Sequence, residues 1–392
     1  MKSFVKELEC SKCGKRYDPE SLINLCECGS PIFVRYDLQL IKTKLKKEDL
    51  SKRNSDMWRY REFLPLINDK NIISMGEGFT PLLKAENLGK YFGLENLYLK
   101  DETINPTGSF KARGLACAIS RAKELGVKKI SLPTAGNAGG AAAAYAAKGG
   151  LKSLIAMPEN TPSAFKLEVI NYGAEVIFTE GSIIDAGKKL SERREKEDWF
   201  DLSTLKEPYR LEGKKTMGIE LAEQLNWNLP DVIIYPTGGG TGLIGMWKAF
   251  NELEQIGWIN SQKPRMVSVQ AEGCAPIVKA FNEGKEKAEE WQNPKTIAAG
   301  LRVPKAVGDF LMLKVLKESS GTAVAVPENE IISGIKEIAS REGIFTSPEC
   351  GALYSALKIL IDKKFVKKTD KIILFLTGSG FKYVDSISSF YI

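Results

Sequence analysis

The sequence predicts an α/β protein made of two three-layer domains with parallel sheets, preceded by a small module that contains four cysteines. From Leu94 onward, apolar runs of strand length alternate with amphipathic helical stretches, and the links between them are short, which is typical of a parallel sheet covered by helices on both faces. The uninterrupted apolar run Val232–Ile234 indicates strands buried on both sides. A length of 392 residues is sufficient for two such domains and a module.

The apolar periodicity predicts the elements in order. An extended segment at Ile32–Asp37 and a charged helical linker at Lys42–Asn54 follow the cysteines. Strands are expected at Leu94–Lys100, Lys129–Leu132, Ser153–Met157, Glu175–Thr179, Asp231–Tyr235, Met266–Ala271, Thr322–Val326 and Lys371–Leu376. Helices are expected at Ser109–Leu125, Asn137–Lys148, Thr161–Tyr172 and Thr216–Leu225. Ligands of such sheets bind where the strands end, so the loops that lead from strand to helix are the places to search for a site.

The composition limits the possible chemistry. There is no apolar run of membrane-spanning length, and the N-terminus lacks the basic-then-apolar order of a signal peptide, so we expect a cytoplasmic protein without a membrane partner. The net charge of +7 comes from lysines and arginines mixed with acids, which favours a solvated surface over a nucleic-acid-binding patch. The absence of histidine excludes a Ser-His-Asp triad, a Cys-His pair and a His-ligated catalytic metal, and favours chemistry supplied by a cofactor.

Four of the seven cysteines lie within the first 28 residues, with the spacing Cys-x2-Cys-x12-Cys-x-Cys. Four thiolates suit a closed structural zinc site, and a glycine after each pair permits the tight turns that such a site needs. The candidate zinc ligands are Cys10, Cys13, Cys26 and Cys28. Two disulfides or four unrelated thiols are the alternatives, and a cytosolic setting disfavours disulfides. The scattered cysteines, expected to be small core residues, are Cys117, Cys274 and Cys350.

The loop Asn105–Gly114 places Lys111 in the first turn of a helix that Ser109 can cap. The partial positive charge of a helix N-terminus disfavours an ammonium group there, and so favours the neutral amine that attacks an aldehyde. For this segment taken alone, a surface lysine with a free head group is an equally good interpretation.

The loop Tyr235–Gly242 follows a buried strand and precedes a helix expected from Leu243. Four glycines let successive backbone N–H groups turn toward a phosphate, and the helix dipole adds a favourable field. The loop lacks the Gly-Lys-Ser/Thr of a Walker motif and the spacing of the dinucleotide fingerprint, so a phosphate monoester fits best. A purely structural glycine turn is the alternative.

Two further loops, Pro133–Gly140 and Phe375–Gly380, also follow strands. In the first, the amide of Asn137 can donate to a phenolic oxygen, while Thr134 and nearby N–H groups can hold a carboxylate. N-capping by Asn137 is the alternative. In the second, hydroxyl groups can face a ring nitrogen, and the alternative is a flexible strand terminus.

Together these four loops resemble the pyridoxal-phosphate (PLP) enzymes of the tryptophan synthase β family, called fold type II, from about Gly76 to Gly380. The order of the four motifs agrees as well as their content. The resemblance implies that Lys111 carries PLP as a Schiff base, that Asn137 contacts its ring hydroxyl, and that Thr377 pairs with its pyridine nitrogen. The residues implied to hold the cofactor phosphate are Gly238, Gly239, Gly240, Thr241 and Gly242.

Within this family the chain is most similar to the threonine synthases, through the segments Gly76–Leu82 and Tyr209–Thr216 and the cysteine-rich start. The implied enzyme is a carbon–oxygen lyase that converts O-phospho-L-homoserine and water to L-threonine and phosphate. A planar guanidinium suits a phosphate dianion, and a surface arginine paired with Glu212 is the alternative for Arg210. The candidate substrate ligands are Thr134, Ser203 and Arg210.

Two positions depart from the pattern of many threonine synthases. Ala112 stands where an acid often follows the lysine, and Ala138 stands where a hydroxyl residue would contact the substrate phosphate. A serine or threonine dehydratase and an O-phosphoserine β-replacement enzyme therefore stay open as alternatives with the same cofactor. A zinc ribbon that binds nucleic acid or a protein is an alternative from another class, but it leaves the glycine loop without a purpose.

The resemblance also implies how the chain is divided and assembled. We expect a zinc-ribbon-like module at 1–36, a large PLP domain at 37–103 and 205–392, and a small mobile domain at 104–204 that closes over substrate. The expected partners are a small anionic amino-acid substrate and a second copy of the chain in a homodimer.

Overall fold

The structure, a computed structural model, describes residues 3–391. Contacts between residues divide the chain into two compact units, each with a parallel sheet of its own. Unit 1 comprises Met1–Phe79, Asn105–Ile219 and Asn251–Trp258. Unit 2 comprises Thr80–Ile104, Glu220–Phe250 and Ile259–Ile392. The α/β fold class with an N-terminal cysteine module is thereby confirmed.

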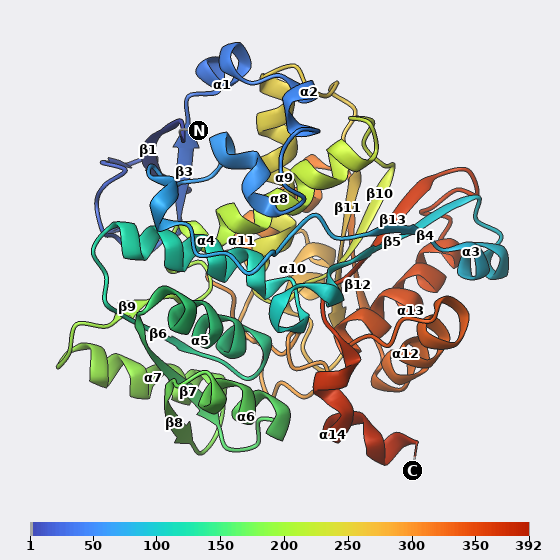
Figure 1. The fold of residues 1–392 in the computed structure, drawn as a ribbon. Coiled ribbons are helices and arrows are strands. Elements are labelled where there is room, and N and C mark those ends of the chain that lie inside the picture. The colour runs from blue at the N-terminus through green and yellow to red at the C-terminus, as the bar shows by residue number, and fades with distance from the viewer. Residues whose placement is uncertain (1–2, 392) are drawn as a thin grey trace. The chain divides into compact units, whose positions relative to one another are not determined.

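The N-terminal part of unit 1 is a three-stranded antiparallel sheet in the order β2-β1-β3, drawn in dark blue in Figure 1. Its strands are β1 (Val5–Cys10), β2 (Arg16–Tyr17) and β3 (Ile32–Tyr36). Alternate residues of β3 are buried, which gives the sheet one apolar face. The predicted extended segment Ile32–Asp37 is confirmed, whereas β1 and β2 are missing from the prediction because charged residues interrupt their apolar pattern.

Two short helices follow the small sheet, α1 (Leu38–Lys44) and α2 (Lys47–Leu50). The carboxylate of Asp37 caps α1 by accepting a 2.9 Å hydrogen bond from the N–H of Leu40. Leu45 is extended and ends that helix. The single helical linker predicted over Lys42–Asn54 is therefore wrong, because a good cap starts a helix earlier and an extended residue interrupts it.

The main sheet of unit 1 has four parallel strands in the order β8-β7-β6-β9. The strands are β6 (Lys129–Pro133), β7 (Lys152–Pro158), β8 (Glu175–Thr179) and β9 (Phe200–Asp201). The helices are α4 (Lys111–Glu124), α5 (Asn137–Gly149), α6 (Ser163–Asn171), α7 (Ile183–Arg194) and α8 (Tyr209–Gln224), of which α8 continues into unit 2 from Glu220. Helices α5 and α6 cover one face of the sheet and α7 covers the other, as Figure 1 shows. This arrangement gives the three layers expected from the strand–helix alternation.

Helix α8 begins seven residues before the predicted start at Thr216. The early part of this helix is rich in charged residues, and the apolar periodicity did not reveal it. In the structure those side chains are buried: the exposed fraction is 1% for Arg210 and 0% for Lys214 and Lys215. The predicted start of α8 was wrong because these charged side chains are buried in the fold rather than exposed to solvent.

Helices α4 and α8 approach each other at two glycines. A Cβ atom on Gly213 would lie 2.1 Å from the carbonyl oxygen of Arg113, and one on Gly114 would lie 2.9 Å from the carbonyl oxygen of Arg210. Both separations are far below a normal contact, so any larger residue would force the helices apart. The glycines therefore let the first turns of these two helices lie against each other.

The sheet of unit 2 has six strands in the order β12-β11-β10-β13-β5-β4. The strands are β4 (Leu82–Lys84), β5 (Asn96–Asp101), β10 (Val232–Pro236), β11 (Arg265–Ala271), β12 (Thr322–Val326) and β13 (Lys371–Leu376). All neighbours pair in parallel except the short edge strand β4, which is antiparallel to β5. The register aligns Ile234 of β10 with Leu374 of β13, so the loops that follow these two strands leave the sheet side by side.

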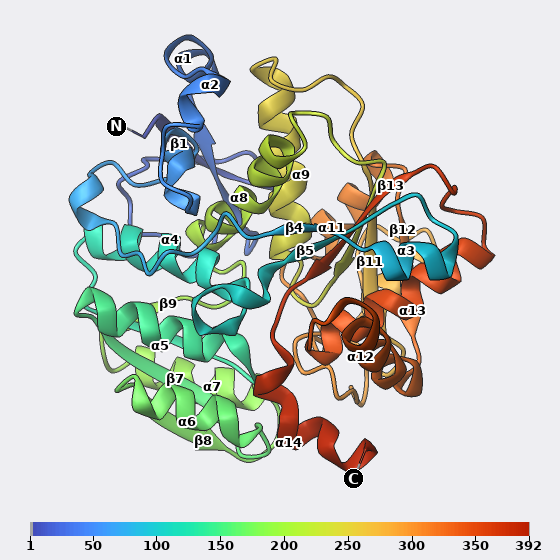
Figure 2. The same ribbon diagram turned by 45° about the vertical axis from the view of Figure 1, so that its right-hand side comes forward.

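Helices cover both faces of this second sheet. The helices of unit 2 are α3 (Glu86–Phe92), α9 (Thr241–Gln255), α10 (Pro276–Asn282), α11 (Asp309–Glu318), α12 (Glu328–Glu342), α13 (Pro348–Asp362) and α14 (Val384–Ile387), of which α9 continues into unit 1. Figure 2 shows α12 and α13 on one face, while α10 and α11 lie on the other. Apolar side chains of the strands and of α13 form one buried core.

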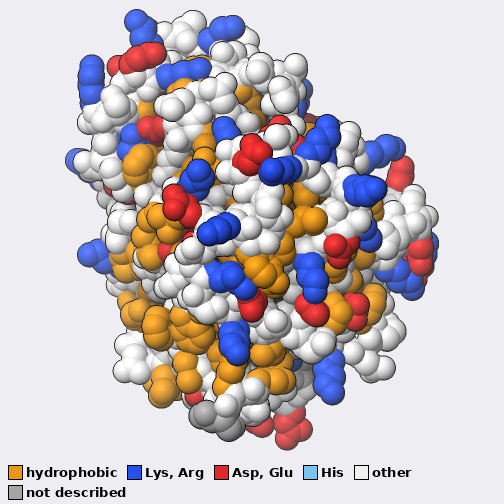
Figure 3. All heavy atoms as spheres, turned by 90° about the vertical axis from the view of Figure 1, so that its right-hand side faces the viewer, with side chains coloured by type: hydrophobic (Ala, Val, Ile, Leu, Met, Phe, Trp, Pro, Cys, Tyr) orange, Lys and Arg blue, Asp and Glu red, His pale blue; other side chains and the backbone are white. Residues whose placement is uncertain are grey.

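Charges of both signs are mixed on the surface. On the face shown in Figure 3, lysines and arginines lie among acidic side chains rather than in one stripe. This matches the mixed charge along the predicted helices. In the part of the chain that the structure describes, no helix has both the length and the apolar composition needed to cross a bilayer.

Candidate active site

Lys111 is the first residue of α4. The residue at the N-cap position is Phe110, and Ser109 contributes only a long contact, its hydroxyl accepting from the N–H of Lys111 at 3.4 Å. The Lys111 Nζ atom lies 4.5 Å from the centroid of the Phe110 ring. Lys111 thus lies in the first turn of a helix, as the sequence predicted, and its amine lies against an aromatic face, which the sequence did not predict.

A second lysine, Lys214 of α8, faces the same ring. Its Nζ atom lies 4.9 Å from the centroid of Phe110, and the side chain is fully buried. Burial lowers the pKa of Lys214 well below its ordinary range, and the nearby charges of Lys111 and Arg210 act in the same direction. Sequence reasoning missed Lys214. The signal available for it was its position four residues after Arg210, which places both on one face of α8.

Arg210 is buried and incompletely bonded. Its Nη1 atom donates to the carbonyl oxygen of Leu202 at 2.6 Å, while Nε and Nη2 have no hydrogen-bond partner among the described residues. Burial lowers the pKa of Arg210, although the carboxylates of Glu207 and Asp201 oppose that effect. Buried donors without acceptors are costly, so this guanidinium is suited to an anion that brings its own oxygens.

The alternative of a surface Arg210 paired with Glu212 is wrong. Arg210 is 1% exposed. Glu212 instead pairs with Lys215 at 2.6 Å and accepts from the hydroxyl of Tyr36 at 2.9 Å. The carboxylate of Glu212 is therefore already bound by Lys215 and Tyr36, on another side of α8.

Glu207 caps the N-terminus of α8. Its carboxylate accepts from the N–H of Tyr209 at 2.7 Å and from the N–H of Arg210 at 3.1 Å. Burial raises the pKa of Glu207 to about 7, against the opposing charge of Arg210. The acid therefore acts as a helix cap first, through both backbone groups.

The third predicted loop joins β6 to α5. Asn137 is the first residue of α5 and the N-cap is Gly136, so the capping interpretation of Asn137 is wrong. The hydroxyl of Thr134 donates to the carbonyl of Gly136 at 2.9 Å and accepts from the N–H groups of Gly136 and Gly139. Thr134 thus shapes its own loop, and its hydroxyl proton is directed to that carbonyl.

The hydroxyl of Ser203 is also used within unit 1. It donates to the carboxylate of Asp201, which also accepts from the N–H of Ser203 at 2.8 Å. Asp201 pairs in addition with Arg194 at 2.7 Å. Of the three candidate substrate ligands, Arg210 alone keeps donor groups that no described residue accepts.

In unit 2, the glycine loop connects β10 to α9, which begins at Thr241, two residues before the predicted start. Among residues 3–391, the backbone N–H groups of Gly238, Gly239 and Gly240 have no acceptor. Gly240 has φ of +78°, a left-handed conformation that favours glycine. Three consecutive donors at the N-terminus of a 15-residue helix suit a phosphate monoester.

Close packing explains two of the four glycines. A Cβ atom on Gly238 would lie 2.1 Å from the carbonyl oxygen of Gly300, and one on Gly242 would lie 1.9 Å from the hydroxyl oxygen of Tyr235. These glycines can therefore serve both purposes. Their close packing fixes the conformation of the loop, and the backbone N–H groups of the loop stay available to a phosphate.

Thr377 follows β13 directly and lies beside the glycine loop through the β10–β13 register. Its N–H donates to the sulfur of Cys350 at 3.1 Å, and its hydroxyl lies 3.8 Å from the same sulfur. Burial raises the pKa of Cys350, so the thiol stays neutral next to this hydroxyl. Cys350 is buried as predicted, but sequence reasoning missed its contact with Thr377, which nothing in the spacing indicates.

The four N-terminal cysteines converge in unit 1. Their sulfur atoms all lie within 4.8 Å of one another, and all four are free thiols, so the disulfide alternative is wrong. The Sγ atoms of Cys10 and Cys28 are 3.5 Å apart, and those of Cys13 and Cys26 are 3.6 Å apart. Four sulfurs around one zinc ion would be about 3.8 Å apart, given Zn–S bonds of about 2.3 Å. The donor set fits a thiophilic metal ion.

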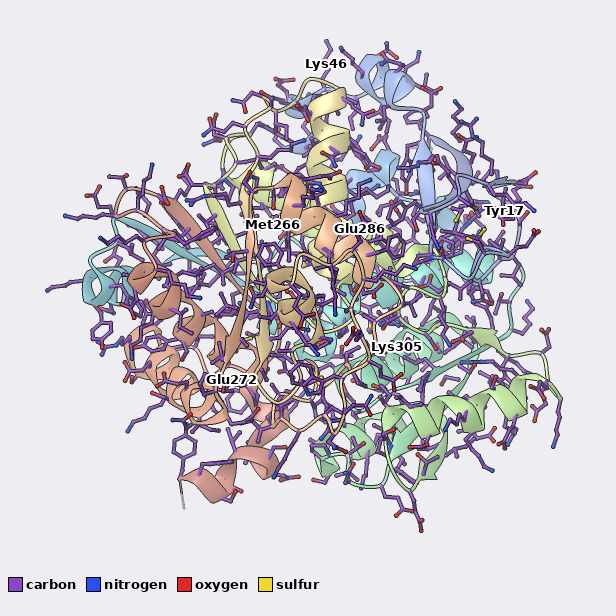
Figure 4. All side chains as sticks on the ribbon, turned by 180° about the vertical axis from the view of Figure 1, so that it is seen from behind. Tyr17, Lys46, Met266, Glu272, Glu286 and Lys305 are labelled. Atoms are coloured by element: carbon purple, nitrogen blue, oxygen red, sulfur yellow. The ribbon has the colours of Figure 1, made fainter. Side chains whose placement is uncertain are left out.

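Neighbouring groups support the thiolate form of two cysteines. The hydroxyl of Tyr17, labelled in Figure 4 beside the yellow sulfur atoms, donates to Cys26 at 3.1 Å. A hydrogen bond from the side chain of Ser30 lowers the pKa of Cys28 to about 6. Hydrogen bonds to ligand sulfurs are the usual outer support of such a metal site.

Comparison with known proteins agrees with this chemistry. Residues 73–378 match the family described as pyridoxal-phosphate dependent enzyme. The threonine synthase of Methanocaldococcus jannaschii is 38% identical over 378 residues, which cover 96% of this chain and 93% of the relative. The threonine synthase of Methanosarcina acetivorans is 33% identical, with coverage of 95% and 91%.

Solved structures share the fold. Maize serine racemase superposes with a TM-score of 0.68 at 23% identity, covering 80% of this chain and 91% of that one. A threonine deaminase from Solanum lycopersicum has a TM-score of 0.67 at 21% identity, with coverage of 80% and 83%. The resemblance inferred from the four loops is confirmed: this chain belongs to the family of pyridoxal-phosphate-dependent enzymes, in the group of the threonine synthases.

Proposed function

We propose that this protein is a carbon–oxygen lyase that converts O-phospho-L-homoserine and water to L-threonine and phosphate. The observation that carries this choice of substrate is Arg210, buried in unit 1 with two donor atoms that no described residue satisfies. A dehydratase acting on serine or threonine has no distal anion to bind and no use for such a group. A phosphorylated substrate supplies the missing acceptors.

The cofactor would be bound by residues of the four loops identified in the sequence. Lys111 would hold it covalently, Asn137 would contact its ring hydroxyl, and Thr377 would face its pyridine nitrogen. The phosphate of the cofactor would be bound by the loop Gly238–Gly242, including Thr241, whose glycine N–H groups supply the donors. When bound, PLP supplies an electron sink for the charge left by a departing Cα proton.

The proton transfers would fall to Lys111. Its Nζ atom would take the Cα proton and a Cβ proton, whose removal lets the γ-phosphate leave, and it would return protons at Cγ and, after water has added at Cβ, at Cα. Thr377 offers a neutral hydroxyl rather than a carboxylate, which favours elimination and replacement over transamination. The absence of histidine poses no difficulty for this sequence of steps.

The test compares substrates on the purified holoenzyme. O-phospho-L-homoserine should yield equal amounts of L-threonine and phosphate, whereas L-serine and L-threonine should yield little pyruvate or 2-oxobutyrate. Lys111→Ala should abolish the yellow colour of the cofactor together with turnover. Keto-acid formation from unphosphorylated amino acids, without threonine from O-phosphohomoserine, would assign a dehydratase instead. Cysteine or another replacement product from O-phosphoserine would assign the third candidate.

We also propose that the four cysteines Cys10, Cys13, Cys26 and Cys28 hold a structural zinc ion. The support is the close clustering of their sulfurs, together with hydrogen bonds donated to Cys26 by Tyr17 and to Cys10 by two backbone N–H groups. Elemental analysis of protein purified without added metal should give one zinc per chain. Less than a tenth of that amount in protein that is fully folded would refute the assignment.

The assembly and location of the protein complete the proposal. By resemblance we expect a homodimer in the cytoplasm, with a small domain at 104–204 that closes over substrate. Light scattering coupled to gel filtration would give twice the chain mass of 43.3 kDa for the dimer.

A further inference from the structure

Lys214 and Lys111 lie on two helices that meet at glycines. The contact of Gly213 with the backbone of Arg113 brings α8 against the first turn of α4. A Cβ atom on Gly114 would lie 2.9 Å from Cε of Lys214, so the absence of a side chain there makes room for the lysine stem. Both Nζ atoms then face the ring of Phe110, at 4.5 Å for Lys111 and 4.9 Å for Lys214.

Lys214 also shares a face of α8 with Arg210. The two residues are four positions apart, which stacks their side chains one helical turn from each other. Both are buried, with exposed fractions of 0% and 1%. Loss of hydration and repulsion from Arg210 both disfavour the charged form of Lys214, and a bound dianion would favour it.

The nearby carboxylates are largely engaged elsewhere. Glu207 accepts from the backbone N–H groups of Tyr209 and Arg210 as the cap of α8. Asp201 pairs with Arg194 and receives the hydroxyl of Ser203. Arg210 keeps two donor atoms without an acceptor among the described residues. A bound dianion could therefore accept from these two donors of Arg210, one helical turn from Lys214.

From this geometry we infer that Lys214 is a specificity-determining residue, which binds the distal phosphate of the substrate together with Arg210. The inference rests on the proposed function and names the residue that completes its phosphate site. The planar guanidinium of Arg210 supplies a fork of donors, and the ammonium of Lys214 supplies a compact charge. Their two charges match those of a phosphate dianion. An unphosphorylated amino acid would leave two donor atoms of Arg210 without an acceptor among the described residues, and so it would bind poorly.

The experiment uses the PLP-loaded enzyme and two probes, O-phospho-L-homoserine in the assay and inorganic phosphate in calorimetric titration. Lys214→Met keeps the length and burial of the side chain but removes its charge. We expect the KM for O-phosphohomoserine and the Kd for inorganic phosphate to rise about 10- to 150-fold, the effect of losing one charged hydrogen bond. Lys214→Arg, which keeps the charge, should stay within about fivefold of the natural enzyme on both measures.

The matched control is Lys188→Gln, which removes a charge from a side chain of α7 that is 73% exposed. It should change neither constant. Cofactor absorbance and circular dichroism establish that each variant is folded and loaded. Should Lys214→Met fail to fold, Lys214→Arg alone decides the matter: phosphate affinity near the natural value supports the inference, and affinity lost in the folded protein overturns it.

Two outcomes would overturn the inference. One is an unchanged Kd for inorganic phosphate in folded, yellow Lys214→Met protein. The other is a shift in the pH at which the cofactor band changes, with phosphate affinity unchanged, which would mean that Lys214 acts on Lys111 alone. If the natural enzyme binds phosphate through Lys214 but makes no threonine from O-phosphohomoserine, the proposed function fails while this inference stands.

Discussion

The hydroxyl of Tyr36 donates a 2.9 Å hydrogen bond to the carboxylate of Glu212. Tyr36 ends the last strand of the cysteine module, and Glu212 lies on α8, the helix that carries Arg210. Lys215 joins the pair: its Nζ atom is 2.6 Å from Glu212 and 3.9 Å from the centroid of the Tyr36 ring. The module is thus tied through a buried polar contact to the helix proposed to bind substrate.

Tyr36→Phe should lower the free energy of unfolding by about 1–3 kcal/mol, because it removes one donor from a buried carboxylate. Burial raises the pKa of Tyr36 well above its ordinary range, so the hydroxyl is a donor at any pH of practical use. Urea denaturation measures the change. Tyr172→Phe, at a ring that is 40% exposed, should stay within about 0.5 kcal/mol of the natural protein. Equal effects of the two substitutions would contradict the prediction.

Asn24 forms a second link between the module and the rest of unit 1. Its amide nitrogen donates to the carbonyl oxygens of Asp201 at 2.8 Å and Lys206 at 2.9 Å. The same segment contains Leu202, whose carbonyl accepts from Arg210. Asn24→Asp, which replaces the donor by a carboxylate that repels both carbonyls, should raise KM for O-phosphohomoserine about 3- to 10-fold, corresponding to about 1 kcal/mol.

The cofactor band should be unaffected by that change, because Asn24 reaches only the segment before α8. Asn24→Ala, which removes the donor without adding charge, should have a smaller effect of the same sign. If the KM of Asn24→Asp equals that of the natural enzyme, the hydrogen bonds of Asn24 do not position Arg210.

Removal of the metal should lower the stability of the protein more than it lowers turnover per folded molecule. Cys10→Ser, or treatment with a strong chelator, is expected to lower the melting temperature while turnover per folded molecule changes less than about twofold, since the module lies outside the residues proposed to bind cofactor. The chelator should have no additional effect on Cys10→Ser protein. Loss of cofactor absorbance in protein that keeps its native melting temperature would argue against this separation.

Much of the fold follows from the sequence because many of the strands are short apolar runs that alternate with amphipathic helices. The strands Glu175–Thr179, Thr322–Val326 and Lys371–Leu376 have the predicted bounds. Two-residue strands such as Phe200–Asp201 are too short to show a period. The division of the chain at 36, 103 and 204 remains a prediction.

The candidate site was predictable where backbone and loop chemistry decide it, as for Lys111 and the glycine loop. It was not predictable where tertiary contacts decide it. A charged run such as Arg210–Lys215 normally indicates a solvated helix face, and only the packing of α8 against α4 and the module shows that these charges are buried. Lys214 was missed for this reason, and the contact of Cys350 with Thr377 was missed because it too depends on tertiary packing.

The last prediction concerns pH and Glu207. Burial raises the pKa of this carboxyl from an ordinary value of 4.5 to about 7 in the folded protein. Between these values the folded state holds a proton that the unfolded state has released, so the free energy of unfolding falls as pH rises from about 4.5 to about 7. The part due to Glu207 is at most about 3 kcal/mol, from about 1.4 kcal/mol per unit of pKa.

Glu207→Gln removes this group and should flatten the decline of stability over that interval. Relative to the natural protein, the variant should therefore be more stable at pH 8 than at pH 5, because the cost of ionising a buried acid is absent. Urea denaturation at both pH values measures the difference. Glu192→Gln, at a side chain that is 61% exposed, should leave the decline unchanged. Parallel pH profiles for Glu207→Gln and the natural protein would mean that Glu207 is already ionised in the folded state, held so by Arg210 and Lys214 together.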